Sequence, residues 1–75
     1  MKFTRHAKNR IRLIARADPG VTPEAVLFGV GSASVLRYDD KGNKVVLVVL
    51  EDRTVTAVVD VKTETIITIW ANESS

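Results

Sequence analysis

The second half of the chain consists of four short apolar runs separated by turns, and this pattern restricts the fold more than any other feature. The runs are rich in Val, Ile, Leu and Thr, residue types typical of β-strands. Because the intervening turns are only a few residues long, successive strands are expected to pair in an antiparallel meander. The predicted strands cover residues 35–38, 44–50, 54–61 and 65–71.

The pattern within the runs predicts how the strands are placed. Residues 44–50 are almost entirely apolar, as expected for a central strand that is covered on both faces. Alternation along the last run assigns its side chains to two faces. Ile67 and Ile69 are expected on one face, and Ile66, Thr68 and Trp70 on the other.

Two helices are predicted before the strands. Thr4 is a favourable N-cap, and an apolar pattern with helical spacing predicts a helix over residues 5–16. A Thr-Pro-Glu sequence is typical of a helix start and predicts a second helix over residues 23–30. Gly29 and Gly31 are expected to weaken and then end it. The core positions expected on the two helices are Ala7, Ile11, Ile14, Ala15, Val26, Leu27 and Val30.

Length and composition favour a single α+β domain over residues 1–75, with the two N-terminal helices packed on a four-stranded antiparallel sheet. The chain contains no cysteine and one histidine, which excludes disulfides, thiolate metal sites and multi-histidine sites. We therefore expect no metal and no cofactor. The stability of so short a chain must come from close packing or from oligomerisation.

The predicted sheet is more apolar than two short helices can cover. Helices on one face leave Val, Ile and Leu side chains on the other face in contact with water. Exposed apolar patches of this kind usually mark an interface. The sequence therefore predicts a homodimer or a dedicated protein partner.

No segment indicates a membrane or secretory location. The longest apolar run, residues 45–50, is far too short to span a bilayer, and no apolar signal segment follows the first two residues. The absence of cysteine is compatible with a reducing compartment. We expect a cytoplasmic protein that does not insert into a membrane.

Positive charge is concentrated at the N-terminal end. The first 16 residues hold six of the eleven basic side chains and no acidic one, whereas the other 59 residues hold five basic and nine acidic side chains. A net charge of only +2 thus conceals a dipolar molecule, which is typical of a protein with one polyanion-binding face. The six cations are Lys2, Arg5, Lys8, Arg10, Arg12 and Arg16.

Three short motifs resemble those of a family of small uncharacterised bacterial domains. H-A-x-x-R-I begins at His6, V-T-x-E-x-V at Val21 and I-I-T-I-W at Ile66. The corresponding motifs of that family read H-A-x-x-R-M, I-T-x-E-D-V and V-I-T-V-Y-W, and the family is similar to the BrnT and RelE toxins. The resemblance covers roughly residues 3–70. One departure is Ile14, which stands where the family usually has a second arginine.

The resemblance implies a RelE/BrnT-like fold and a metal-independent endoribonuclease, often a toxin neutralised by an antitoxin. RNA cleavage needs groups that move protons and a cation that stabilises the phosphorane. His6 is the expected general acid or base, since histidine titrates near neutral pH, and Arg10 is expected to hold the scissile phosphate. Lys8, Arg12 and Arg16 are expected to bind flanking phosphates. The sequence does not identify a second proton carrier.

Three functions remain open from the sequence. They are a toxin-like ribonuclease, a non-catalytic nucleic-acid-binding module that uses the same basic helix, and a dimeric protein-interaction subunit that uses the apolar sheet face. The first two predict steep salt dependence of RNA binding. Simpler interpretations are a local hydrogen-bonding role for His6, a solvated helix face for the arginines, and a core or interface position for Trp70.

Overall fold

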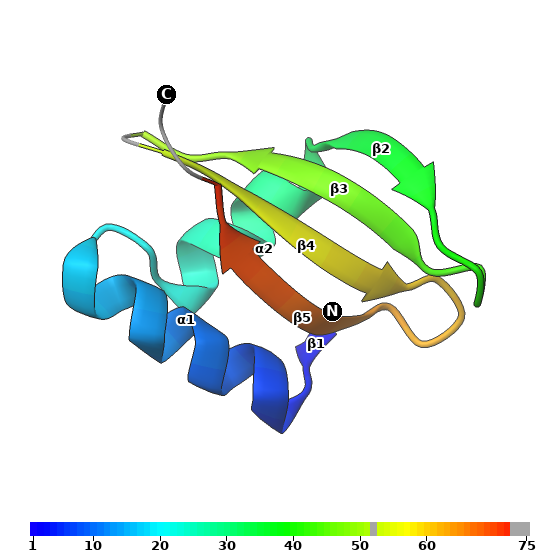
Figure 1. Ribbon diagram of the computed structural model, residues 1–75, viewed down its shortest axis with the longest axis horizontal. Coiled ribbons are helices and arrows are strands. Elements are labelled where there is room, and N and C mark those ends of the chain that lie inside the picture. Colours follow the sequence, from blue (N-terminus) through cyan, green and yellow to red (C-terminus); the bar gives the residue numbers. More distant parts are fainter. Residues whose placement is uncertain (52, 73–75) are drawn as a thin grey trace.

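In the computed structural model, two helices pack on one face of a five-stranded sheet (Figure 1). The structure describes residues 1–51 and 53–72. The elements are β1 (Lys2–Phe3), α1 (Arg5–Ala17), α2 (Pro23–Gly31), β2 (Ser34–Tyr38), β3 (Lys44–Val49), β4 (Thr54–Asp60) and β5 (Thr65–Ala71). The strand order is β1-β5-β4-β3-β2. The predicted α+β class, both helices and all four predicted strands are confirmed to within about two residues at each end.

The sheet is mixed, so the predicted four-stranded antiparallel sheet is wrong in one respect. β1 adds a fifth strand that pairs in parallel with the start of β5, with Lys2 opposite Thr65 and Phe3 opposite Ile66. The other three neighbouring pairs are antiparallel, as predicted. A strand of two residues is too short to show an alternating pattern, so no local sequence signal marks it.

Thr4 joins the start of α1 to the edge of the sheet. Its Oγ1 accepts a hydrogen bond from the Ala7 amide at 3.1 Å, which makes it the predicted N-cap. The same hydroxyl donates to the Ile67 carbonyl oxygen at 2.7 Å, and the Thr4 amide donates to the Ile66 carbonyl oxygen at 3.0 Å. One residue therefore starts the helix and fixes it against β5.

One apolar core lies between the helices and the sheet. α1 contributes the predicted residues Ala7, Ile11 and Ile14, and α2 contributes Val26 and Val30, whereas Leu27 is only partly buried at its margin. The remaining core residues come from strands β3, β4 and β5 and from the segment between the helices. They are Val21, Val46, Val48, Val55, Ala57, Val59, Ile66 and Ile69.

Gly29 has a packing role that differs from the one predicted. α2 continues through it to Gly31, and Gly29 is buried against β3. A Cβ atom at this position would collide with Cγ1 of Val48, so the close approach of α2 to β3 requires glycine. The residue fixes the distance between helix and sheet, and α2 ends at Gly31, as predicted.

A β-bulge in β5 overturns the predicted assignment of its faces. Val59 pairs with Ile66 and Val58 pairs with Thr68, which leaves Ile67 as an extra residue. Ile66 and Ile69 therefore both point into the core, although strict alternation had assigned them to opposite faces. The run at residues 44–50 forms β3, which lies between β4 and β2, so its predicted position inside the sheet is confirmed.

Neither of the two helices among the described residues has the combination of length and apolar character needed to cross a membrane.

Candidate nucleic-acid interface

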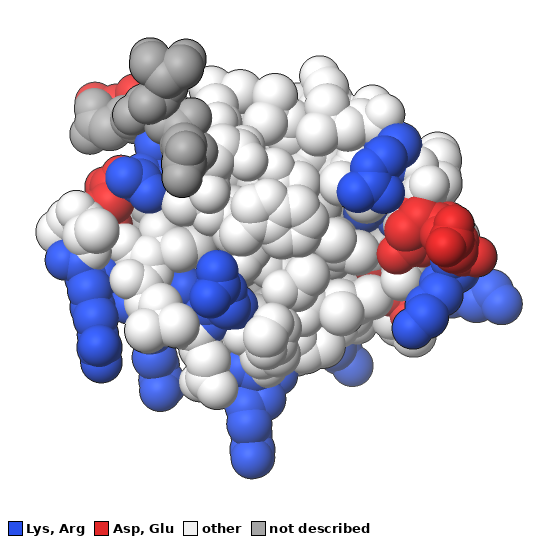
Figure 2. Space-filling model, in the orientation of Figure 1, with Lys and Arg blue, Asp and Glu red and all other residues white. Residues whose placement is uncertain are grey.

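α1 and the preceding strand display the six basic side chains of Lys2, Arg5, Lys8, Arg10, Arg12 and Arg16, here called the cationic surface. All except Arg10, which is half-buried, are exposed. Figure 2 shows basic side chains along the edge of the molecule where α1 lies, and both acidic and basic side chains at the far end, near the β2–β3 turn. Within residues 1–51 and 53–72, the ion pair present is Asp18–Arg53, at 2.8 Å. No described carboxylate thus neutralises the cationic surface.

The stability of the helix does not account for these charges. The first turn of α1 contains no acidic residue, although the positive end of the helix dipole favours one there. Arg5 and Lys8 instead place positive charge near that end, and a cation there costs a few tenths of a kcal/mol. Only Arg16, in the last turn, lies where the dipole favours a cation. A ligand with negative charge would relieve this repulsion.

His6 and Arg10 occupy the flank of α1 that faces β5. They are four residues apart and therefore neighbours on the helix surface. The His6 side chain is exposed, and the Arg10 guanidinium donates from Nε to the Ile69 carbonyl oxygen at 3.3 Å. The structure thus brings together the two residues that the sequence predicted as catalytic, with Arg10 held by β5. No described side chain forms a hydrogen bond with His6, and a second proton carrier is not identified among the described residues.

Lys8 and Arg12 occupy the opposite flank of α1, next to the start of α2. They border a hollow of about 400 Å³, here called the α1–α2 hollow. Its apolar lining includes Ile11, Val21 and Pro23. Arg16 is exposed on the outer surface of α1. The five residues predicted as a site are therefore divided between two flanks and the outer surface of one helix.

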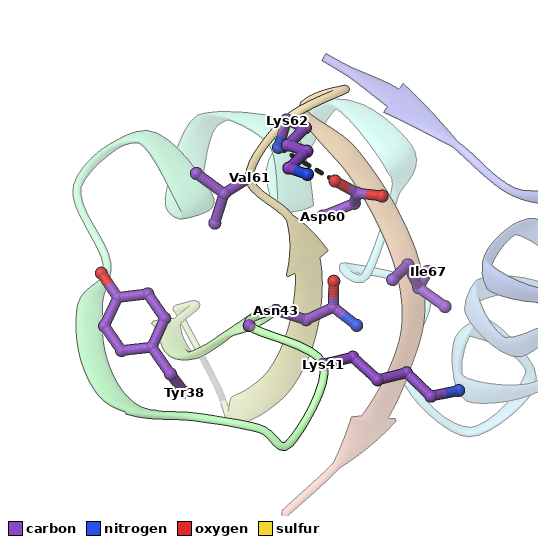
Figure 3. A pocket seen from close by; sticks show the side chains of 8 residues that line it. Tyr38, Lys41, Asn43, Asp60, Val61, Lys62 and Ile67 are labelled. Carbon is purple, nitrogen blue, oxygen red and sulfur yellow. Dashed lines mark hydrogen bonds between the residues drawn. The ribbon is translucent and has the colours of Figure 1, made fainter.

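A larger hollow of about 660 Å³ lies at the other end of the sheet, between the β2–β3 and β4–β5 turns (Figure 3). Tyr38 at the end of β2 and Asn43 in the following turn line one side, and Asp60 at the end of β4 and Lys62 in the following turn line the other. The Asp60 carboxylate accepts a hydrogen bond from the Lys62 amide at 2.9 Å (Figure 3). Sequence reasoning missed this hollow because two separate turns form it. Its lining carries both charge signs, so it does not select an anion or a cation.

The β2–β3 turn is held by the side chain of Asp39. The Asp39 carboxylate accepts hydrogen bonds from the Lys41 amide at 2.9 Å and the Asn43 amide at 2.8 Å. Desolvation tends to raise the pKa of this carboxyl, but the bonds from Asn43 and Lys41 outweigh it and hold the pKa below its ordinary value. The carboxylate of Asp39 therefore has a structural role, which is to hold the turn.

The sheet face opposite the helices is partly uncovered, as the sequence predicts. Val49 and Trp70 project from this face and are 69% and 36% exposed. Figure 2 shows that the middle of the view is occupied by uncharged side chains. The face is not bare throughout, because Thr56 is buried and donates from Oγ1 to the Asn72 side-chain oxygen at 2.9 Å.

The described part of the chain contains no group of three or more histidine, aspartate or glutamate side chains that could hold a metal ion. Comparisons of the chain with protein-family models, with curated proteins and with solved structures find no match.

Proposed function

We propose that this protein binds RNA through the cationic surface, with the basic side chains of α1 in contact with successive phosphates. The observation that supports this proposal is the set of six basic side chains without a described carboxylate partner, five of them exposed. Unpaired Lys and Arg side chains on one helix provide the charge that a phosphate backbone requires. RNA is preferred over DNA as the ligand because of the motifs that begin at His6, Val21 and Ile66.

Salt dependence tests the proposal directly. Fluorescence anisotropy of a labelled single-stranded RNA should show affinity that falls steeply with salt, by about 0.7 log units of affinity per log unit of salt for each phosphate contact. The double variant Arg12→Gln/Arg16→Gln removes two contacts, so its slope should be about 1.4 smaller in magnitude. Arg37→Gln/Lys62→Gln is the matched control, because it removes the same charge outside the cationic surface. Equal weakening by both pairs, or no RNA binding at low salt, would contradict the proposal.

Cleavage of the bound RNA is the second candidate function. It would make the protein a metal-independent endoribonuclease of the RelE/BrnT type, with His6 as general acid or base and Arg10 on the scissile phosphate. The exposure of His6 beside Arg10 favours this candidate. It ranks below binding for two reasons. Arg10 Nε already donates a hydrogen bond to the Ile69 carbonyl oxygen, and catalysis needs a second proton-transferring group, which is not identified among the described residues.

Incubation of labelled RNA without divalent metal separates the two candidates. Products that form with the wild-type protein, and disappear with His6→Ala while RNA binding survives, would establish cleavage. Intact RNA with wild type, His6→Ala and Arg10→Ala would remove the enzyme function and leave binding.

A third candidate is self-association through the uncovered sheet face, which the exposure of Val49 and Trp70 favours. Burial of an exposed valine stabilises an interface, whereas a charge at its centre disfavours it. Sedimentation at high micromolar concentration should then show a dimer for the wild-type protein and a monomer for Val49→Lys. A wild-type monomer at that concentration would exclude this candidate.

A further inference from the structure

The α1–α2 hollow combines an apolar lining with two cations at its border. We propose that it holds one unpaired nucleobase of the bound RNA while Lys8 and Arg12 contact the adjoining phosphates. The inference rests on the proposed RNA binding and goes further, because it specifies single-stranded RNA as the ligand.

The lining of the hollow suits a flat, mostly apolar ring. Ile11 and Val21 are each only 2% exposed and form part of the core. Phe3, Pro19 and Pro23 add an aromatic ring and two pyrrolidine rings. The volume of about 400 Å³ falls within the range of small-molecule sites, which is about 300–1,000 Å³. Aromatic side chains provide a stacking surface for bases of any sequence.

The border of the hollow suits the charge of the backbone that carries such a base. Lys8 and Arg12 are neighbours on one flank of α1, both are exposed, and neither has a carboxylate within ion-pair distance among the described residues. A neutral ligand would leave these two charges unused. A nucleotide satisfies both the apolar lining and the cationic border.

The geometry of nucleic acids determines which RNA can supply the base. In a duplex the bases are paired and stacked, and side chains cannot enter the deep, narrow major groove of an RNA helix. Bases in single strands and loops can be turned outward and stacked on protein side chains. The hollow should therefore favour single-stranded RNA over a duplex with the same number of phosphates.

Filling the hollow tests the inference. Ala15 lines it, so Ala15→Leu occupies part of its volume without a change in charge. Ala17→Leu is the matched control, because Ala17 is an exposed residue of the same helix outside the lining. The probes are a single-stranded RNA of ten nucleotides, a duplex of the same length, and heparin, which has charge but no bases. Circular dichroism and melting curves show whether each variant is folded.

We expect Ala15→Leu to weaken single-stranded RNA binding about tenfold, the effect of losing one stacked base, and to leave heparin and duplex binding unchanged. Ala17→Leu should bind all three probes as wild type does. Equal affinity of the two variants for single-stranded RNA, or an equal loss of affinity for all three probes in Ala15→Leu, would overturn the inference. If the wild type binds neither RNA nor heparin, the proposed function itself fails.

A second measurement on the wild-type protein does not depend on the folding of any variant. Uridine monophosphate should shift the methyl resonances of Ile11 and Val21 in NMR spectra, whereas ribose 5-phosphate, which lacks the base, should not. Equal shifts with both compounds, or no shift with either at millimolar concentration, would overturn the base-binding role of the hollow.

Discussion

Arg10 on α1 donates a hydrogen bond from Nε to the carbonyl oxygen of Ile69 on β5, at 3.3 Å. β1 pairs with β5 only at Thr65 and Ile66, so β5 continues beyond the end of its short parallel partner. Thr4 Oγ1 donates to the Ile67 carbonyl oxygen, and Arg10 donates to the carbonyl oxygen two residues further along β5. Thr4, which caps α1, and Arg10, on α1, thus donate hydrogen bonds to the part of the β5 edge that β1 does not reach. A sheet edge covered in this way is protected from pairing with another chain.

Replacement of Arg10 tests how much this contact contributes. Arg10→Ala should lower the free energy of unfolding by about 1 kcal/mol, because it removes one hydrogen bond to a partly buried carbonyl. Arg12→Ala is the control on the same helix, and its effect should stay within about 0.5 kcal/mol, as is usual for exposed positions. Urea unfolding followed by circular dichroism measures both values. Equal effects of the two substitutions would show that the bond to Ile69 does not stabilise the fold.

Thr4 should be more sensitive than Arg10, because its hydroxyl makes two bonds. Thr4→Val keeps the shape of the side chain but removes both the cap of Ala7 and the donor to Ile67. The cap contributes about 0.5–2 kcal/mol and the second bond about 1 kcal/mol, so a loss of about 2 kcal/mol is expected. Thr4→Ser retains the hydroxyl and should recover most of this loss in thermal or urea unfolding. A valine variant as stable as the wild type would show that the two bonds of the Thr4 hydroxyl do not stabilise the fold.

The parts of the fold that could be predicted from sequence are those that local chemistry determines. Thr4 and the Thr22–Pro23 pair mark helix starts, and the spacing of Ala7, Ile11 and Ile14 marks the buried face of α1. β1 and the bulge at Ile67 depend on pairing with distant residues, and no local pattern reveals them. Likewise, the small size of Gly29 is explained only by the position of Val48 on another element.

The candidate site shows the same division. The sequence reveals the cations of α1 and the absence of acidic residues from the same segment, because charge and helix position can be read locally. It does not reveal that Lys8 and Arg12 border a hollow, because the segment from Pro19 to Pro23 forms the other side. That segment folds back on α1 after the helix has ended, and its position depends on the burial of Val21.

Gly29 provides a sharp test of the packing between α2 and β3. In an ordinary helix position alanine is more stable than glycine by about 1 kcal/mol. At Gly29 the added methyl group would meet Val48, and the resulting overpacking should lower the free energy of unfolding by about 1–3 kcal/mol. Gly31→Ala is the control, because a Cβ atom there has no neighbour within 4 Å, so this variant should be neutral or slightly stabilised. Stabilisation by Gly29→Ala in urea unfolding would show that α2 can move away from β3 without cost.

Asp39 should make the stability of the fold depend on pH in the acid range. The pKa of Asp39 is below its ordinary value of 3.8, since the hydrogen bonds from Asn43 and Lys41 outweigh the opposing effect of desolvation. A lowered pKa in the folded state means that the ionised carboxylate stabilises the fold above the ordinary value and that this stabilisation is lost as pH falls through the folded pKa. The free energy of unfolding should therefore decline below about pH 4. The substituted side chain in the variant Asp39→Asn cannot titrate, so the free energy of unfolding of this variant, measured in urea across this range, should decline less than that of the wild type. Asp40→Asn is the control, because Asp40 makes none of these bonds, and it should follow the wild type. Parallel curves for the wild type and Asp39→Asn would show that the turn is equally stable with a neutral side chain at this position.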